Sequence, residues 1–172
     1  MTEIELPEHA SDPKTRTVGI LVGVVGIFLS VVTIASHRAH TQAVITRTES
    51  NDDWAFYQAK KIRANVSDAA LTLLTALASD QPKAAEAKAK LEAARDKELG
   101  DTEQLRSKAE ASEKQTDLEE VRALKFDIGE GLLELGLVLC SLFFLARNSF
   151  FPIFGVLSAA AGIAMGIWGW LL

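Results

Sequence analysis

Hydrophobic residues occupy two long blocks of this chain, and an extended polar segment separates them. Residues 18–36 contain no Asp, Glu, Lys or Arg, and residues 131–172 contain only Glu134 and Arg147 as formal charges. An uncharged helix of 19 residues covers roughly the 30 Å hydrocarbon core of a bilayer. We therefore predict a polar tail at 1–17 and a transmembrane helix at 18–36. A cleaved signal peptide fits less well, because acidic residues outnumber cations in the tail.

The second block predicts two further transmembrane helices, at 128–146 and 150–172. The link between them, RNSFFP, is short, and Pro152 suits the first turn of the last helix. We expect these two helices to form a tight antiparallel pair. Trp168 and Trp170 lie at the far end of the last helix, where indole rings prefer the membrane interface.

Small residues repeat at alternating spacings of four and three in two of the predicted spans. The first set is Gly19, Gly23, Gly26, Ser30 and Thr33, and the second set is Gly155, Ala159, Gly162, Gly166 and Gly169. This spacing places each set on one helix face, and small residues allow helix backbones to approach closely in a membrane. We expect both faces to be packing surfaces, either within the chain or between copies.

The polar segment, residues 37–127, predicts helices rather than strands. Apolar residues recur every three or four positions over 54–78, at Ala55, Ala59, Ile62, Val66, Ala69, Leu73 and Leu77. A further helix is expected between Pro82 and Gly100, with Asp80 as its N-cap. Another, capped by Asp101, is expected to run from Thr102 for roughly 45 residues into the second span, along a stripe of Leu118, Val121, Lys125, Ile128, Leu132, Leu135, Leu139 and Leu142.

The resulting fold class is an all-α membrane protein with three transmembrane helices and an extramembrane antiparallel helical hairpin, or coiled-coil, insert. The first span either continues as a helix toward residue 78 or breaks at residues 48–53, before the first helix of the insert. Alanine-rich seams bury little apolar area, so self-association would help to stabilise the insert. A solitary, solvated helix pair is the alternative.

Trp54 and Tyr57 form the most distinctive cluster of the insert, in the stretch NDDWAFYQAKKIR. They are three residues apart and therefore share a helix face, whereas Phe56 is turned away from them. We interpret the two rings as packing residues, in the insert or against a second copy. Contact with the membrane surface and an aromatic ligand site are the alternatives.

Several elements together resemble a family of short bacterial membrane proteins that is classed only as a domain of unknown function. Its Asn-x-x-Trp-x-x-Tyr-Gln-Ala-Lys element is matched by Asn51, Trp54, Tyr57, Gln58, Ala59 and Lys60. A Leu-Glu element at the head of a later membrane helix is matched by Leu133 and Glu134. The resemblance implies a three-span protein of the bacterial inner membrane and implies no activity.

Glu134 is the most conspicuous polar residue of the apolar blocks. A carboxylate in hydrocarbon costs on the order of 3 kcal/mol and is expected to be paired, protonated or hydrated. Arg38 and His37, at the end of the first span, are the expected partners, and a Glu134–Arg38 pair would join two helices. Snorkelling of Glu134 to the interface, or an ion or proton pathway, are the alternatives.

Composition excludes several classes of function. The net charge is −5 and no basic patch is evident, so nucleic acid is not an expected partner. Cys140 is the single cysteine and is expected to be a packing residue. We expect no metal site, although His37, His40 and Glu134 are residue types that can bind zinc. We expect no cofactor and no catalytic residues, because no nucleophile set can be assembled.

The sequence thus predicts a non-enzymatic, self-associating integral membrane protein that acts as a scaffold or docking surface. Its expected partners are the lipid bilayer, further copies of itself and a protein bound at the helical insert. The alternative is a small ion or proton channel or transporter that uses Glu134. The expected location is the bacterial inner membrane, with the N-terminus cytoplasmic and the insert periplasmic, because Arg147 lies in the short link on the N-terminal side.

Overall fold

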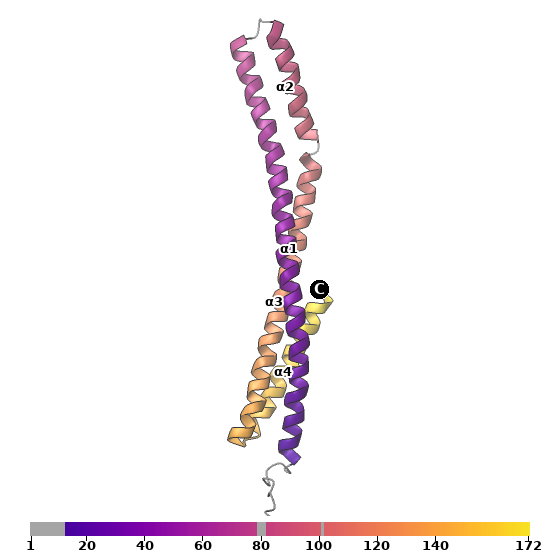
Figure 1. Cartoon of the computed structure of the whole chain (residues 1–172), viewed down its shortest axis with the longest axis vertical. Coiled ribbons are helices and arrows are strands. Elements are labelled where there is room, and N and C mark those ends of the chain that lie inside the picture. The colour runs from indigo at the N-terminus through magenta and orange to yellow at the C-terminus, as the bar shows by residue number, and fades with distance from the viewer. Residues whose placement is uncertain (1–12, 79–81, 101) are drawn as a thin grey trace, which may run out of the picture. The chain divides into compact units, whose positions relative to one another are not determined.

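The part of the chain that the computed structural model describes, residues 13–78, 82–100 and 102–172, is all-α. Its helices are α1 (Pro13–Ala78), α2 (Pro82–Gly100), α3 (Thr102–Ala146) and α4 (Phe150–Leu171) (Figure 1). The all-α class predicted from the periodicity is confirmed.

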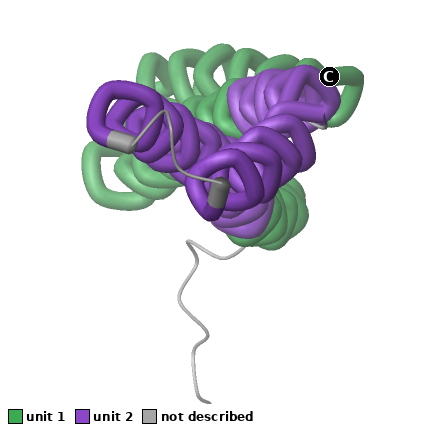
Figure 2. The backbone as a smooth tube through the Cα atoms, turned by 90° about the horizontal axis from the view of Figure 1, so that it is seen from above, with its two compact units in different colours: residues 1–43, 118–172 green, residues 44–117 purple. Residues whose placement is uncertain are grey.

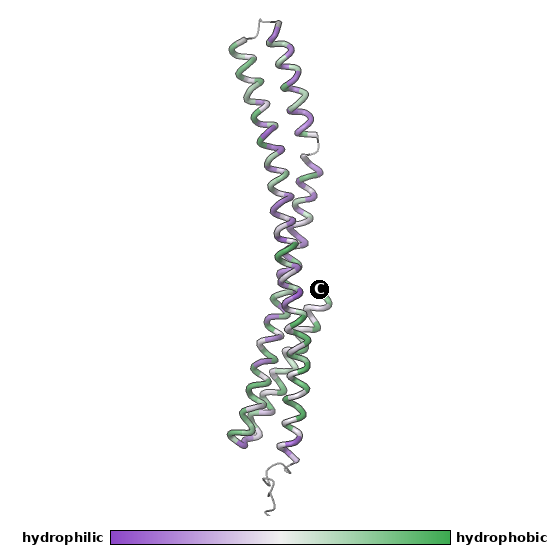
Figure 3. Tube along the Cα trace, viewed as in Figure 1, coloured by the Kyte–Doolittle hydropathy of each residue, from purple (hydrophilic) through white to green (hydrophobic). Residues whose placement is uncertain are grey.

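In the part of the chain that the structure describes, three helical stretches are long and apolar enough to cross a membrane, judged by length and composition. They lie within Pro13–Leu77, within Lys83–Ala146 and at Phe150–Leu171. Figure 3 shows the hydrophobic residues concentrated along α4 and along the parts of α1 and α3 beside it. The three apolar segments expected from the sequence are therefore all helical.

Helix boundaries follow the local signals closely. α2 begins at Pro82 and ends at Gly100, and α3 is one helix of 45 residues, as predicted. The break considered at 48–53 is wrong, because α1 is continuous there; this stretch is polar but contains neither Pro nor Gly. The caps expected at Asp80 and Asp101 lie outside the described residues.

The chain divides into two compact units, which Figure 2 shows in different colours. Unit 1 contains residues 1–43 and 118–172, and unit 2 contains residues 44–117. The core of unit 1 combines the first part of α1, the last part of α3, and α4. Its buried members are Val25, Val32, Ala39, Ala123, Phe126, Leu133 and Ala159.

The small-residue face of α4 packs against α3 within unit 1. The buried residues of α4 are the predicted set, Gly155, Ala159, Gly162, Gly166 and Gly169. A β-carbon added at Gly162 would lie 2.7 Å from the carbonyl oxygen of Gly129, and one at Gly155 would lie 2.8 Å from that of Gly136. These contacts pair α3 and α4 antiparallel, as expected, and confirm that this face is a packing surface.

A tight turn connects α3 to α4. Arg147 adopts a positive φ of 51°, and its backbone N–H donates a 2.8 Å hydrogen bond to the carbonyl oxygen of Phe143. This left-handed residue closes the end of α3. Asn148 then accepts a 3.0 Å hydrogen bond from the N–H of Phe150 at the start of α4.

The small-residue face of α1 behaves differently from that of α4. Added β-carbons at Gly19 and Gly23 would meet no atom of the described chain within 4 Å. The inward residues of this part of α1 are instead Val18, Val25 and Val32. Of the three glycines in the predicted set, only Gly26 would bring an added β-carbon to another described helix, 3.8 Å from Cδ1 of Leu137 in α3. Packing of Gly19 and Gly23 between copies stays a prediction.

The large apolar stripes predicted on α1 and α3 also point away from the helix contacts. Leu118 and Leu135 of the α3 stripe are 56% and 51% exposed. The contact face of α3 holds mostly smaller or polar residues: Ala109 and Thr116 in unit 2, and Glu119, Ala123, Phe126, Leu133 and Cys140 in unit 1. The apolar spacing thus predicts the helices correctly, but the close contacts between helices are made by another face, where small side chains predominate.

Unit 2 is held together by polar contacts between α1 and the helices that follow it. Arg63 Nε lies 3.3 Å from Glu98 Oε2, and Arg95 Nη1 lies 3.4 Å from Asp68 Oδ1. Arg63 pairs with Glu98, and Asp68, further along α1, pairs with the earlier residue Arg95 of α2. The two helices therefore run antiparallel in this unit.

Trp54 and Tyr57 share a face of α1, as predicted. Their ring centroids are 5.7 Å apart and the ring planes meet at 82°, an edge-to-face contact. Lys61 places its Nζ 5.8 Å from the centroid of the Tyr57 ring. Phe56, on another face of α1, is 52% exposed.

Asp53 provides a pH-dependent contact in unit 2. Hydrogen bonds from Lys108 Nζ (2.6 Å) and Ser112 Oγ (2.7 Å) hold the pKa of Asp53 below its ordinary value of 3.8. A lowered pKa stabilises the folded state above pH 3.8, and this contribution disappears as the pH falls through the folded-state pKa.

We expect Asp53→Asn to lower the stability of the protein by about 1 kcal/mol at pH 7. The difference in unfolding free energy between the variant and the wild type should shrink as the pH falls below 3.8, and it should vanish below the lower folded-state pKa, where the carboxylate of the folded wild type is also protonated. Thermal unfolding in detergent, followed by circular dichroism at pH 7 and pH 3, measures both values. A difference that does not change with pH would contradict this role.

Candidate functional site

A cluster of polar side chains joins α1 to α3 in unit 1, and we call it the polar ladder. It consists of Thr33, Ser36 and His40 on α1 and of Asp127 and Glu130 on α3. Thr33 Oγ1 donates a 2.7 Å hydrogen bond to Glu130 Oε1, and Ser36 Oγ donates a 2.8 Å hydrogen bond to Asp127 Oδ1. His40 Nε2 lies 2.8 and 2.9 Å from the two carboxylate oxygens of Asp127.

Helix periodicity explains why these residues meet. Residues 33, 36 and 40 follow steps of three and four and therefore share one face of α1. Residues 127 and 130 do the same on α3, and the order of the contacts is reversed because the helices are antiparallel. Ser36 is 2% exposed, and a buried hydroxyl without a partner would cost free energy. The ladder thus fixes the register of α1 against α3.

One further polar contact ties α4 to α3. Ser158 Oγ donates a 2.7 Å hydrogen bond to the carbonyl oxygen of Leu132. This contact lies beside the close approach of Gly155 to Gly136. Both helices that pack against α3 in unit 1 therefore attach to it through hydroxyl donors.

The structure does not bring Glu134 to Arg38. Both side chains are exposed, and neither forms a hydrogen bond or ion pair with a residue that the structure describes. Asp127 meets Ser36 and Glu130 meets Thr33, so in this antiparallel register Glu134 lies beyond Thr33, on the side away from Arg38. The expected pairing of Glu134 with Arg38 is therefore corrected: the carboxylates that meet α1 are Asp127 and Glu130.

Among the carboxylates of this part of α3, Asp127 and Glu130 are the ones that form hydrogen bonds with α1. They share a stripe with Glu134 in the sequence, but only they face a matching polar series on α1. The signal was present in the first span, where Thr33, Ser36 and His40 repeat at helical spacing. His37, the other predicted partner of Glu134, is exposed.

The ladder is suited to helix attachment rather than to metal binding. Within the described ranges, no group of three His, Cys, Asp or Glu side chains is placed to hold a metal ion. Two carboxylates accept hydrogen bonds from two hydroxyls and one imidazole, and these contacts link α1 to α3.

Comparison with known proteins places the whole described fold in one family. Residues 14–172 match the family described as a domain of unknown function, DUF4337. The chain belongs to this family. The match confirms the resemblance drawn from the Asn51–Lys60 element, and it spans both units of the DUF4337 chain. No curated protein and no solved structure matches the chain.

Proposed function

We propose that this DUF4337 chain is a non-enzymatic membrane scaffold that self-associates through α1 of unit 2. Unit 1 spans the bacterial inner membrane with its three apolar helices. Unit 2 stands outside the bilayer on the periplasmic side, and the N-terminus is cytoplasmic. Copies of the chain are its first partners, and a further protein docks on the assembled unit 2.

The observation that carries this proposal is an exposed apolar stripe on α1 of unit 2. Ile62, Val66 and Leu73 are 61%, 63% and 61% exposed. Together with Ala55, Ala59, Ala69 and Leu77 they keep the spacing of a coiled-coil seam. A different face of α1, which includes Ala64 and Leu71, is the one buried within the unit.

A second copy of the chain is the occupant that fits this stripe best. Spacings of four and three hold a seam against another helix over several turns. Copies that insert into one membrane in the same direction present this stripe in parallel, so identical positions meet. Alanines at three of the seven stripe positions allow a close approach, while Ile62, Val66, Leu73 and Leu77 supply most of the apolar area.

Cysteine crosslinking in native membranes tests the proposed assembly. Leu73→Cys should form a disulfide-linked dimer under mild oxidation, because position 73 of one copy would face position 73 of another. Thr75→Cys is the matched control, since Thr75 is also exposed but lies outside the stripe. Cys140 is buried and can remain in both variants.

Equal crosslinking at positions 73 and 75 would reject the stripe as the interface. A wild-type protein that remains monomeric in mild detergent, with no crosslink from Leu73→Cys in membranes, would reject self-association itself.

A further inference from the structure

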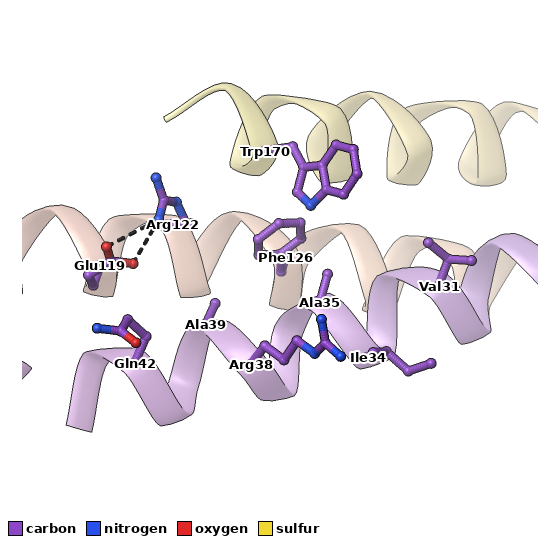
Figure 4. A pocket seen from close by; sticks show the side chains of 10 residues that line it. All are labelled: Val31, Ile34, Ala35, Arg38, Ala39, Gln42, Glu119, Arg122, Phe126 and Trp170. Atoms are coloured by element: carbon purple, nitrogen blue, oxygen red, sulfur yellow. Dashed lines mark hydrogen bonds and ion pairs between the residues drawn. The ribbon is translucent and has the colours of Figure 1, made fainter. Parts of the chain in front are cut away.

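An amphipathic groove lies between α1, α3 and α4 in unit 1. Its volume is about 560 Å³. Figure 4 shows Gln42, Glu119 and Arg122 at one end and Val31 at the other, with Arg38 between them. The groove therefore changes from polar to apolar along its length.

A second cavity continues the apolar end of this groove. It measures about 200 Å³ and shares Val31, Ala35, Phe126 and Trp170 with the first. Its remaining walls are apolar and include Phe28 and Ile167. The two cavities together provide a long hydrophobic surface that starts at a polar mouth, which is the shape of a lipid with its headgroup and one acyl chain.

The charges at the mouth favour an anion. Arg122 Nη1 lies 2.9 and 3.1 Å from the carboxylate oxygens of Glu119, which offsets one positive charge. Arg38 is exposed and has no polar partner among the residues that the structure describes. Its planar guanidinium can donate two parallel hydrogen bonds to a phosphate.

The depth of the groove also agrees with a headgroup site. Trp170 lines both cavities near the end of α4, and tryptophan prefers the membrane interface. Lys125 lies nearby, with its Nζ 4.6 Å from the centroid of the Trp168 ring. Cations and indole rings therefore occur together at the level where phosphates of a bilayer would lie.

We propose that this groove binds one anionic glycerophospholipid of the surrounding bilayer. Arg38 holds the phosphate, and one acyl chain lies along Val31, Phe126 and Trp170. The proposal rests on the membrane insertion of unit 1 stated above, but it does not depend on self-association.

Native mass spectrometry of the full chain in detergent tests the site. With equal amounts of phosphatidylglycerol and phosphatidylcholine of the same acyl chains, the wild type should retain phosphatidylglycerol about fivefold better, because both lipids carry a phosphate but only phosphatidylcholine offsets it with a cationic choline. Arg38→Gln should abolish this preference. Arg147→Gln, at the α3–α4 turn, should keep it because Arg147 lies outside the groove.

A blocking variant tests the acyl-chain part of the groove. Val31 is 57% exposed and lines both cavities, so Val31→Trp should fill them without disturbing the core. We expect this variant to lose both lipids. Retention of the wild-type lipid pattern by Val31→Trp would overturn the assignment of the groove.

The preference for one lipid headgroup and the insertion of the chain into the membrane are tested by separate measurements. Resistance to alkaline extraction from membranes, combined with equal binding of the two lipids or an unchanged preference in Arg38→Gln, would overturn the lipid site alone. Extraction of the wild type by alkaline carbonate would overturn both the lipid site and the proposed membrane insertion.

Discussion

Gly162→Leu is expected to separate α4 from α3 and to destabilise unit 1 by about 3 kcal/mol, the upper part of the range for overpacked cores. A β-carbon at this position would lie 2.7 Å from the carbonyl oxygen of Gly129 and 3.0 Å from the backbone nitrogen of Leu133. Both are backbone atoms of a regular helix, so neither can turn aside as a side chain would. The helices must move apart and lose their contact.

Gly23→Leu is the matched control for this prediction. The substitution is identical and the position is also in an apolar helix, but an added β-carbon meets no described atom within 4 Å. We expect its unfolding by increasing SDS mole fraction, followed by circular dichroism, to match the wild type within about 0.5 kcal/mol. Equal losses in the two variants would show that leucine at such positions is harmful in general and that the α3–α4 contact is not the cause.

The same control variant also addresses the packing of α1 between copies. If Gly19 and Gly23 form an intermolecular contact, Gly23→Leu should reduce oligomer size in mild detergent while the unfolding of the single chain is unchanged. The two glycine faces would then have different roles, one within the chain and one between chains.

Helix type, helix ends and the α3–α4 pair could be predicted from the sequence because their signals are local. Pro82 and Gly100 bound α2, and the 45-residue span of α3 follows from the lack of proline and of a cluster of turn residues. The α4 face was also predicted correctly, because small residues at spacings of four and three indicate close backbone contact directly.

The contact faces of α1 and α3 could not be predicted by the same reasoning from large apolar residues. In a soluble helix the largest apolar side chains mark the core, but here Leu135 and Ile62 are exposed while Ala123 and Ser36 are buried. Lipid, or another copy of the chain, can cover large apolar residues. The spacing of a stripe is therefore informative, whereas residue size does not show which stripe faces the neighbouring helix.

The pairing predicted for Glu134 was wrong for a different reason. A charged residue within an apolar run draws attention by itself, but its partner depends on the register in which α1 lies along α3. Asp127 and Glu130 lie at the polar end of that run and appeared less unusual. Only the packed helices show that Thr33, Ser36 and His40 lie opposite these two carboxylates.

Asp127→Ala is expected to destabilise the α1–α3 contact by roughly 2 kcal/mol, the usual range for hydrogen bonds to a charged group. The change removes the acceptor of both Ser36 and His40, and it leaves the hydroxyl of Ser36 without this partner at a buried position. Asp127→Asn should cost less, because its amide oxygen can still accept the hydrogen bond from Ser36.

Glu134→Ala provides the comparison that separates the two carboxylates. Glu134 lies two turns further along α3, is exposed, and has no polar partner among the described residues. Its removal should change the SDS-unfolding free energy by no more than about 0.5 kcal/mol. A larger loss for Glu134→Ala than for Asp127→Ala would mean that Glu134 holds the helices together and that the polar ladder does not. We expect the larger loss of unfolding free energy for Asp127→Ala, because a carboxylate stabilises a helix pair only through the donors that it faces.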